Sequence, residues 1–466
     1  MRPVIVSLSL AALACDAGPQ PAASGAGSNT ASAAASARPA GSAAGAARPS
    51  AGAGSAPAAP ASAEGPARPS RPLNVLYLTI DSMRADMPWN GYPRPIAPNL
   101  TKLAAESVVY THAYSASSYT AKSVATMLTG QHASTLYRSG WFFANYAPAN
   151  EFITEAMQAK GIRTIGGQAH MYFGRGKGLE QGFDVWEIVP GITFDAQTDN
   201  HVTSDKLTKL AMEHLGKVEP GKQFFAWFHY MDPHDKYLKH EESPDFGNKN
   251  RDRYDSEIWF TDKHIGELLA WCAKQPWWAT TALVISADHG EAFGENDAHR
   301  HAFDLWETLT RVPWMWKLPG VAPRRIDVRR SHLDLAPTVM ELMGLPPLAG
   351  FTGQSLVAEL HGADATPRPF IMTELAEDSH NPQVRAIVVG DWKLKVWGNG
   401  WKVELYDLAS DPGEKSDLSR TRKDKLDELR QIYDAEVAKL PIVEPYGGMK
   451  LKGGKEAKGP SAPRKP

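Results

Sequence analysis

The sequence predicts an α/β fold with a large, mostly parallel central sheet, and three observations lead to this prediction. Apolar, β-rich runs at 73–80, 224–228 and 282–286 are continuous rather than alternating, which is typical of strands buried on both faces. Helical patterns lie between these runs. Asp or His follows each run, and open α/β sheets bind ligands beyond the carboxyl ends of their strands. We therefore expect helices on both faces of the sheet and a site at one edge.

The expected elements alternate along the chain. The first run leads into Asp81, the second into His229 and the third into Asp288 and His289. Helices are expected at 97–106, 205–215 and 258–271. Three strands that bring Asp, His and Asp-His to one edge have the layout of a metal site.

A smaller C-terminal part follows this alternation. A helix reaches Met343 and stops at Gly344, strand-like runs cover 384–389 and 392–396, and a helical stripe covers 423–440. We interpret 73–350 as the main domain and 351–445 as a C-terminal α+β subdomain packed on it.

The composition excludes two classes of protein. Lys and Arg number 50 against 52 Asp and Glu, which gives a formal charge of -2 and no field for wrapping nucleic acid. A hydrophobic content of 42% is ample for a buried core and excludes a wholly disordered chain.

The N-terminal segment is typical of an exported protein. Residues 1–15 combine a cationic start with a short apolar run, as in a signal peptide, and the run is too short to span a bilayer. The segment before Cys15 resembles a bacterial lipoprotein lipobox, although Ala12 stands where Leu is usual. We expect a lipid anchor at Cys15 that holds the protein to a membrane of the bacterial cell envelope. The alternative is an ordinary signal peptide that is cleaved slightly later.

Two flanking segments have the composition of solvated chain. Residues 16–70 are mainly Ala, Gly, Ser and Pro and cannot bury enough surface to offset their ordering entropy, so we expect a disordered linker. Residues 446–466 form a basic tail for which we expect the same. Cys272 is the second of only two cysteines, so a lipidated Cys15 leaves no internal disulfide.

Several motifs occur in an order that is typical of one enzyme family. They are NVLYLTIDSMRAD at 74–86, YPRPIAPNLTKL at 92–103, ATMLTG at 125–130, SADHGE at 286–291, RVP at 311–313 and ELYDLASDPGE at 404–414. This series resembles the sulfatase family of the alkaline phosphatase superfamily over about residues 73–420. The resemblance implies an alkaline-phosphatase-like sandwich and a metal-dependent hydrolase or transferase that acts on anionic esters.

The chain departs from the family at the nucleophile. Sulfatases convert the Cys or Ser of a C/S-x-P-S-R motif to formylglycine, but the matching position is Thr120, and Lys122 replaces the Pro. Threonine cannot become an aldehyde hydrate by that route. Thr120 therefore resembles the direct nucleophile of the superfamily's phosphoryl-transfer enzymes, and it opens an expected helix whose N–H groups favour an anion. The alternative for Thr120 is a plain helix N-cap. Lys122 either neutralises the transferred group or is a solvated surface lysine.

The family resemblance also implies a metal site. Asp81, Asp288 and His289 are the expected ligands beside Thr120, and carboxylates with imidazole favour Zn or Mn over Ca. Ser82 stands where sulfatases usually place a second Asp, which weakens the case for a calcium site of the sulfatase type.

Three histidines are candidates for substrate binding. His229 and His234 lie in a segment that resembles the family's H-x-x-x-P-H-x-P-Y, and His301 matches a later family histidine. We expect them either to bind a second metal or to hold the ester oxygens, with His234 or His301 protonating the leaving group and His299 as the competitor for the role of His301. A structural role is the ordinary one for a lone His.

The expected substrate is a phosphate, phosphonate or sulfate ester, with a lipid head group and a glycan both open as the alcohol part. Two alternatives remain at this point. One is a true sulfuric ester hydrolase that works without formylglycine. The other is a non-catalytic surface binding protein with a sulfatase fold.

Overall fold

The computed structural model describes residues 71–193, 201–447 and 462–465. The expected signal peptide at 1–15 with Cys15, the linker at 16–70 and most of the tail at 446–466 lie outside the described residues. Within the described residues, each helix is too short or too polar to cross a bilayer.

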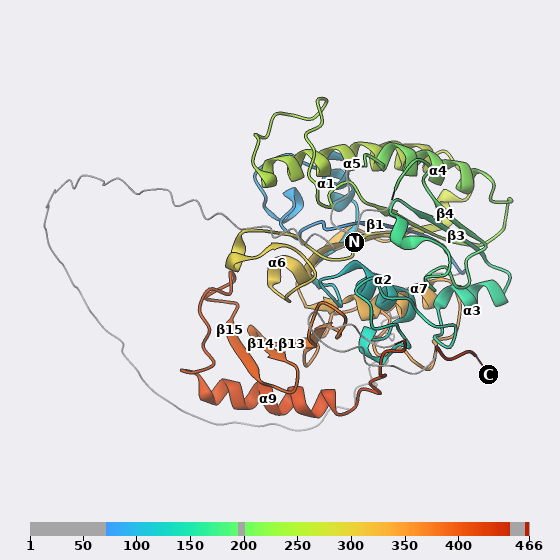
Figure 1. Cartoon of the computed structure of the whole chain (residues 1–466). Helices are drawn as coiled ribbons and strands as arrows, with labels where there is room; N and C mark the ends of the chain where they lie inside the picture. The colour runs from blue at the N-terminus through green and yellow to red at the C-terminus, as the bar shows by residue number, and fades with distance from the viewer. Residues whose placement is uncertain (1–70, 194–200, 448–461, 466) are drawn as a thin grey trace, which may run out of the picture. The chain divides into compact units, whose positions relative to one another are not determined.

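The described residues contain one large mixed sheet at the centre of the fold (Figure 1). Across the sheet the strands are β10 (Arg324–Ile326), β2 (Val108–Tyr114), β9 (Arg311–Lys317), β6 (Thr281–Ala287), β1 (Asn74–Ile80), β5 (Phe224–Tyr230), β3 (Arg163–Gln168) and β4 (Val185–Ile188), and β11 (Arg330–Ser331) also pairs with β2. The expected mostly parallel sheet is confirmed. Only β9 among these strands runs antiparallel, to both β2 and β6.

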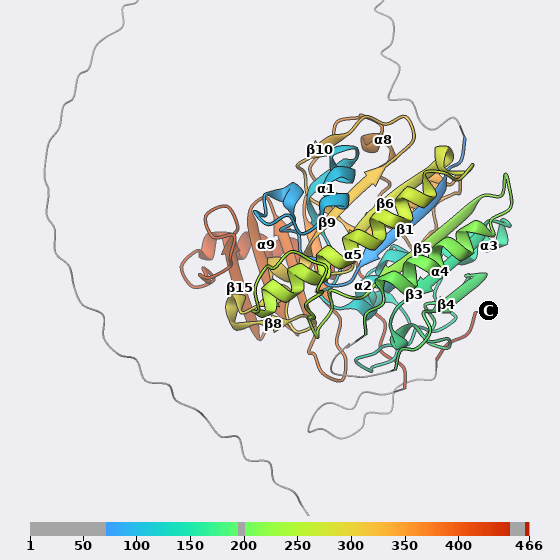
Figure 2. The ribbon, with the colours of Figure 1, turned by 90° about the horizontal axis from the view of Figure 1, so that it is seen from above.

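Helices cover both faces of this sheet, as expected (Figures 1 and 2). One face carries α1 (Pro98–Ala105), α4 (Ser204–Gly216) and α5 (Asn250–Cys272). The other carries α2 (Thr120–Thr129), α3 (Ile153–Ala159) and α7 (Leu335–Leu342). Shorter elements are α6 (Glu307–Thr310), α8 (Val357–Leu360), β7 (Ala292–Phe293) and β8 (His299–Arg300).

Local chemistry explains where these helices begin and end. Pro98 starts α1, and the Asp262 carboxylate on α5 accepts hydrogen bonds from the Asn99 and Leu100 backbone N–H groups, which caps the helix from outside. α2 ends at Gly130, whose positive φ of 66° places it in the left-handed region that favours glycine. The core between the layers is continuous, and the tryptophans of β5 and β9 are fully buried.

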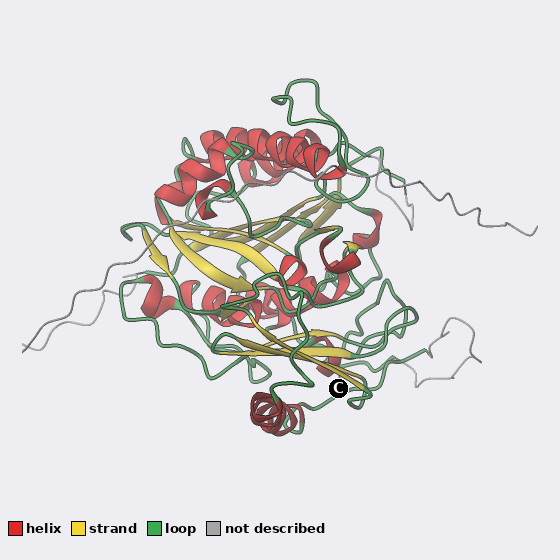
Figure 3. Ribbon diagram, turned by 90° about the vertical axis from the view of Figure 1, so that its left-hand side faces the viewer, coloured by secondary structure: helices red, strands yellow, loops and turns green. Residues whose placement is uncertain are grey.

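A second, antiparallel sheet forms the C-terminal subdomain and lies beyond the α2 and α7 layer, with one helix on its outer face (Figure 3). Its elements are β12 (Ile371–Leu375), β13 (Val384–Val389), β14 (Trp392–Trp397), β15 (Lys402–Asp407) and α9 (Lys423–Val437). Sequence patterns had indicated β13, β14 and α9, but not β12 or β15. The Glu374 N–H donates to the Ala116 carbonyl at 2.8 Å, so the subdomain also contacts the segment just before α2.

The register of the central strands positions the site. Ile80 at the end of β1 pairs with Ala287 of β6 on one side and with Tyr230 of β5 on the other. Asp81 and Asp288 are each the next residue along, so the two carboxylates leave the same edge of the sheet on neighbouring strands.

Candidate active site

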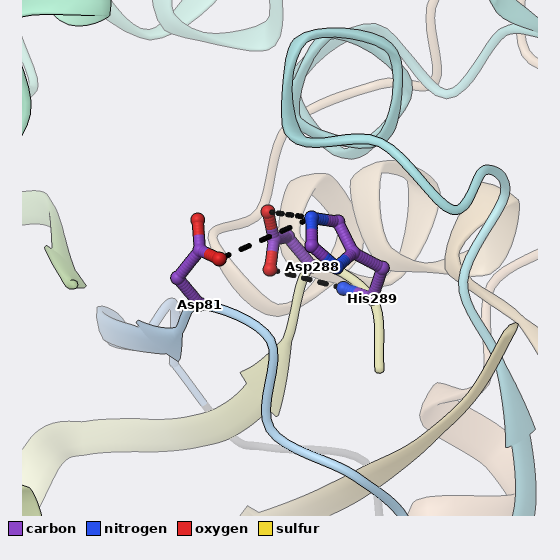
Figure 4. A group of neighbouring side chains, drawn as sticks. All are labelled: Asp81, Asp288 and His289. Carbon is purple, nitrogen blue, oxygen red and sulfur yellow. Dashed lines mark hydrogen bonds and ion pairs between the residues drawn. The ribbon is translucent and has the colours of Figure 1, made fainter. Parts of the chain in front are cut away.

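Three expected ligands converge at the carboxyl ends of β1 and β6 (Figure 4). One donor atom from each of Asp81, Asp288 and His289 lies within 4.8 Å of the others, and all three side chains are fully buried. His289 Nε2 is 3.3 Å from Asp288 Oδ2 and 4.0 Å from Asp81 Oδ1. The sequence had placed these residues at one sheet edge, and the structure brings their side chains together.

Thr120 completes this cluster from the other side. It is the first residue of α2, and its Oγ1 lies 3.2 Å from Asp81 Oδ2 and 3.0 Å from His289 Nε2. The N-cap of α2 is Tyr119, so the interpretation of Thr120 as a plain helix N-cap is wrong. Its hydroxyl contacts the acidic cluster instead.

The electrostatics of the cluster fit a bound cation. Burial and the neighbouring Asp81 charge raise the pKa of Asp288 well above its usual value, because two carboxylates in a dry site repel each other. His289 donates from Nδ1 to the Gly290 carbonyl at 3.0 Å, which leaves Nε2 as a lone-pair donor. Burial and His301 lower the pKa of His289 to about 3, so the imidazole is neutral. Two carboxylates and a neutral imidazole are the donors that a divalent transition metal takes.

Ser82 holds the carboxylates of Asp81 and Asp288 in place. Its Oγ donates to Asp81 Oδ1 at 2.7 Å and its backbone N–H donates to Asp288 Oδ1 at 3.2 Å. The His289 N–H also donates to Asp288 Oδ1, at 3.0 Å. The serine therefore fixes the orientation of the Asp81 and Asp288 carboxylates.

His229 lies behind Asp81 rather than in the open cavity. Its Nε2 donates to Asp81 Oδ2 at 3.1 Å, and its Nδ1 lies 2.7 Å from Thr79 Oγ1, which accepts a hydrogen bond from Trp227 Nε1. The ring is fully buried and both nitrogens are engaged. The structure thus gives His229 the position of a residue that orients Asp81, whereas the sequence interpretation had it bind substrate.

His234 and His301 line the cavity next to the cluster. Their ring centroids are 5.0 Å apart, and the His301 ring lies 4.2 Å from that of His289. Glu291 holds His301 Nδ1, with both carboxylate oxygens at 3.3 Å. Burial lowers the pKa of His301, but the Glu291 carboxylate outweighs it and the pKa lies above its usual value. His299 is exposed on β8, outside the cavity lining.

Lys122 is not a surface residue, and the solvated alternative is wrong. Its side chain is buried within α2, its ammonium forms an ion pair with Asp378, and it lies 5.0 Å from the centroid of the Tyr119 ring. Lys122 does not belong to the cavity lining among the described residues. Its position is that of an anchor for the N-terminal turn of α2.

The cavity in front of the cluster has a volume of about 280 Å³. Its lining combines Asp81 and Thr120 with histidines and Arg300, and with six aromatic side chains. Arg300 Nη2 forms an ion pair with Asp235 Oδ2 at 2.8 Å. An anion that reaches Thr120 would therefore meet imidazole and guanidinium groups on its way.

Sequence reasoning missed two charged partners of the site. Glu291 follows Gly290 directly in the SADHGE motif, so the motif itself could have indicated it. Asp378 lies 256 residues after Lys122 in a loop with no recognised motif, and no local pattern indicates the pair. The aromatic lining also comes from separate loops, and its residues show no shared spacing.

Comparison with known proteins decides the family. The sulfatase family model matches residues 73–345, which is more than half of the chain. The chain belongs to the sulfatase family. A choline-sulfatase of Rhizobium meliloti is 32% identical over 183 residues, which cover 39% of this sulfatase-family chain and 35% of the relative. The alignment thus spans about a third of that relative's length.

Two solved sulfatase-fold structures have the same architecture. A 2-O GAG sulfatase superposes with a TM-score of 0.68 at 18% identity, covering 84% of this chain and 99% of that one. The phosphonate monoester hydrolase of Agrobacterium radiobacter superposes with a TM-score of 0.64 at 18% identity, covering 79% and 95%. At this identity the likeness establishes the sulfatase fold and no more.

Proposed function

We propose that this protein is a metal-dependent hydrolase of anionic esters in which Thr120 is the nucleophile. The observation that carries the proposal is the position of Thr120 Oγ1, 3.0–3.2 Å from His289 and Asp81 in a buried Asp-Asp-His cluster. Asp81, Asp288 and His289 would hold the cation. Bound there, a divalent ion would lower the pKa of a neighbouring hydroxyl and offset negative charge on the ester. The donor set supports Zn or Mn over Ca.

The residues around Thr120 have defined parts in this reaction. Oγ1, held 3.2 Å from Asp81 Oδ2, attacks the phosphorus or sulfur, its proton is released to solvent water, and the bond to the ester oxygen breaks. His301 or His234 then donates a proton to the departing alkoxide. Glu291 fixes His301 through Nδ1, which leaves Nε2 to donate. Water attacks the threonyl ester and regenerates the hydroxyl, or an acceptor hydroxyl takes the group in a transferase.

Variants at Thr120 test the proposal directly. The purified chain would be assayed with Mn²⁺ or Zn²⁺ on 4-nitrophenyl phosphate, bis(4-nitrophenyl) phosphate, 4-nitrophenyl phenylphosphonate and 4-nitrophenyl sulfate. Thr120→Ala should lower kcat by about 10³-fold or more, while Thr120→Ser, which keeps the hydroxyl, should retain activity within about tenfold. A phosphoryl or sulfuryl adduct on Thr120 in quenched samples would support the covalent step. Full turnover by Thr120→Ala would remove Thr120 from the mechanism.

Sulfuric ester hydrolysis without formylglycine is the second candidate, and the similarity to a choline-sulfatase favours it. The same substrates separate the two, because it predicts that the sulfate is the best ester. The third candidate, a non-catalytic binding protein, predicts degraded ligands. The close approach of Asp81, Asp288 and His289 argues against it.

We also propose that the protein is exported to the bacterial cell envelope and anchored through lipidated Cys15. The cationic and apolar start of the chain and its lipobox-like segment support this. Incorporation of labelled palmitate into the full chain, and its loss in Cys15→Ser, is the expected result. An unlabelled chain would contradict the anchor.

A further inference from the structure

The cavity that leads to Thr120 has a continuous aromatic wall. Its members are Tyr119, Phe142, Phe143, Tyr172, Phe173 and Phe303. The rings of Phe303 and Phe142 are almost parallel, with an interplanar angle of 12° and centroids 6.2 Å apart, and Phe142 stacks on Tyr119 at 4.2 Å. Phe303 is 59% exposed, whereas Tyr119 is buried and precedes Thr120 in the chain. The rings therefore form a row from the solvent to the candidate nucleophile.

The inner part of this wall is held in place before any ligand arrives. The Phe142 N–H donates to Ser379 Oγ at 3.1 Å, and its ring lies 4.9 Å from that of His380. The Tyr172 hydroxyl donates to the Ala144 carbonyl at 2.8 Å. A ligand ring placed against Phe142 thus meets a preformed apolar surface, and little ordering entropy is lost on binding.

The polar part of the lining suits an anion and not a polyhydroxylated group. Besides Thr120 and the tyrosines, the described polar lining residues are Asp81, three histidines and Arg300, and none carries a side-chain amide. Asp81, the only carboxylate in this described lining, already accepts hydrogen bonds from Ser82 and His229. The hydroxyl groups of a sugar would find one carboxylate and no side-chain amide oxygen to accept from them in this described lining, and each group left unpaired carries a cost.

We propose that the cavity takes an ester whose alcohol is a single flat, apolar group, such as an aryl or benzyl group, held between Phe142 and Phe303. A ring in contact with both faces needs about 7 Å between them, because contacting carbons lie about 3.5 Å apart. The exposed Phe303 can move outward to admit it. The volume of about 280 Å³ lies just below the usual range for ligand pockets, so it suits one ring with its anionic group. This inference rests on the proposed function, since it assumes that the anionic end lies at Thr120.

Binding of non-hydrolysable phosphonates tests the ring subsite without turnover. Calorimetry on the full chain with Mn²⁺ would compare phenylphosphonate with methylphosphonate, which differ only in the ring. Phenylphosphonate should bind about tenfold more tightly, and Phe142→Ala should abolish that difference. Trp141→Ala is the matched control, because Trp141 is exposed and adjacent in sequence but is not part of the lining. Equal affinities in the wild type would overturn the inference.

Turnover of two matched esters tests the alcohol class. Benzyl phosphate and glucose 6-phosphate are both esters of a primary alcohol on a six-membered ring, and the corresponding sulfates serve if sulfate is the anion that reacts. We expect kcat/KM to be at least tenfold higher for the benzyl ester, with this ratio falling toward one in Phe142→Ala and in Phe303→Ala.

The two proposals fail in different ways. If the wild type prefers the glucose ester and its turnover still depends on Thr120, only the proposal of a flat, apolar alcohol is overturned. Turnover that survives in Thr120→Ala overturns the proposed function, while the phosphonate comparison still decides the ring subsite.

Discussion

The buried ion pair between Lys122 and Asp378 allows a quantitative test of how the C-terminal subdomain supports the site. Both side chains are at most 2% exposed. Burial lowers the pKa of Lys122, and Asp378 only partly restores it, whereas the Lys122 ammonium holds the pKa of Asp378 below its usual value despite burial. Each of these buried charges is tolerable only while the other is present.

Removing both partners should therefore destabilise the protein less than the sum of the two single removals. Asp378→Asn leaves the ammonium buried without a counter-charge, which costs about 3–5 kcal/mol of unfolding free energy. Lys122→Met should cost less, about 2 kcal/mol, because Asp378 still accepts hydrogen bonds from His380 and Asn381. The double variant should lose no more than Asp378→Asn alone, a coupling energy of about 2 kcal/mol.

Urea unfolding followed by tryptophan fluorescence, with chelator present so that metal binding does not contribute, measures each free energy. Asp391→Asn is the control, because Asp391 forms an exposed ion pair with Arg329 and should cost less than about 1 kcal/mol. A cost below about 1 kcal/mol for Asp378→Asn, or additive single effects, would refute the reasoning.

Three further results are expected. Asp288→Asn should weaken Mn²⁺ binding and remove most of the rise in Tm that Mn²⁺ causes, a stabilisation of about 3 kcal/mol at a Mn²⁺ concentration of 100 times Kd. Asp297→Asn, at an exposed position, is the control and should keep this rise. Equal Mn²⁺-induced shifts in Tm in the two variants would contradict the metal site. Burial lowers the pKa of His332 to about 3 from about 6.5, so the unfolded chain binds the extra proton and stability falls as pH decreases from 6.5 toward 3. His332→Gln should make this decline shallower by up to about 1.4 kcal/mol per pH unit, as measured by urea unfolding from pH 6.5 to 4.5, and an unchanged slope would count against it. Lys395→Met should destabilise the protein by about 3 kcal/mol, because the buried Lys395 pairs at 2.7 Å with Asp304 in the loop that carries His301. Lys402→Met, at a half-exposed site, should cost less than about 1 kcal/mol in the same assay. Similar losses in the two variants would argue against the buried pair.

Strand-end residues were predictable because sheet topology itself brings them together. Continuous apolar runs indicated β1, β5 and β6, and parallel pairing then placed Asp81 and Asp288 at one edge. Thr120 was found by counting from a motif, and its contact with Asp81 follows from the start of α2 at that edge.

The features that could not be predicted depend on contacts between distant parts of the chain, which leave no local sequence pattern. The antiparallel β9 follows a long segment that carries His289 and His301, and nothing in the sequence of β9 specifies its direction. His229 could be placed at a strand end, but whether its ring faces the cavity or Asp81 depends on packing around Thr79. Lys122 was ambiguous for the same reason, because a lysine's partner in a distant loop decides whether it is solvated or buried.

The segment that the family model matches is tied to the C-terminal subdomain by buried ion pairs. The family model matches residues 73–345, yet within this range Glu307 of α6 pairs at 2.9 Å with Lys393 of β14, as Lys122 pairs with Asp378. A fragment cut at residue 345 would leave Lys122 and Glu307 without these counter-charges and would expose the surface that the second sheet covers. Any excision, fusion or domain exchange in this protein therefore has to carry the C-terminal subdomain along with the catalytic half.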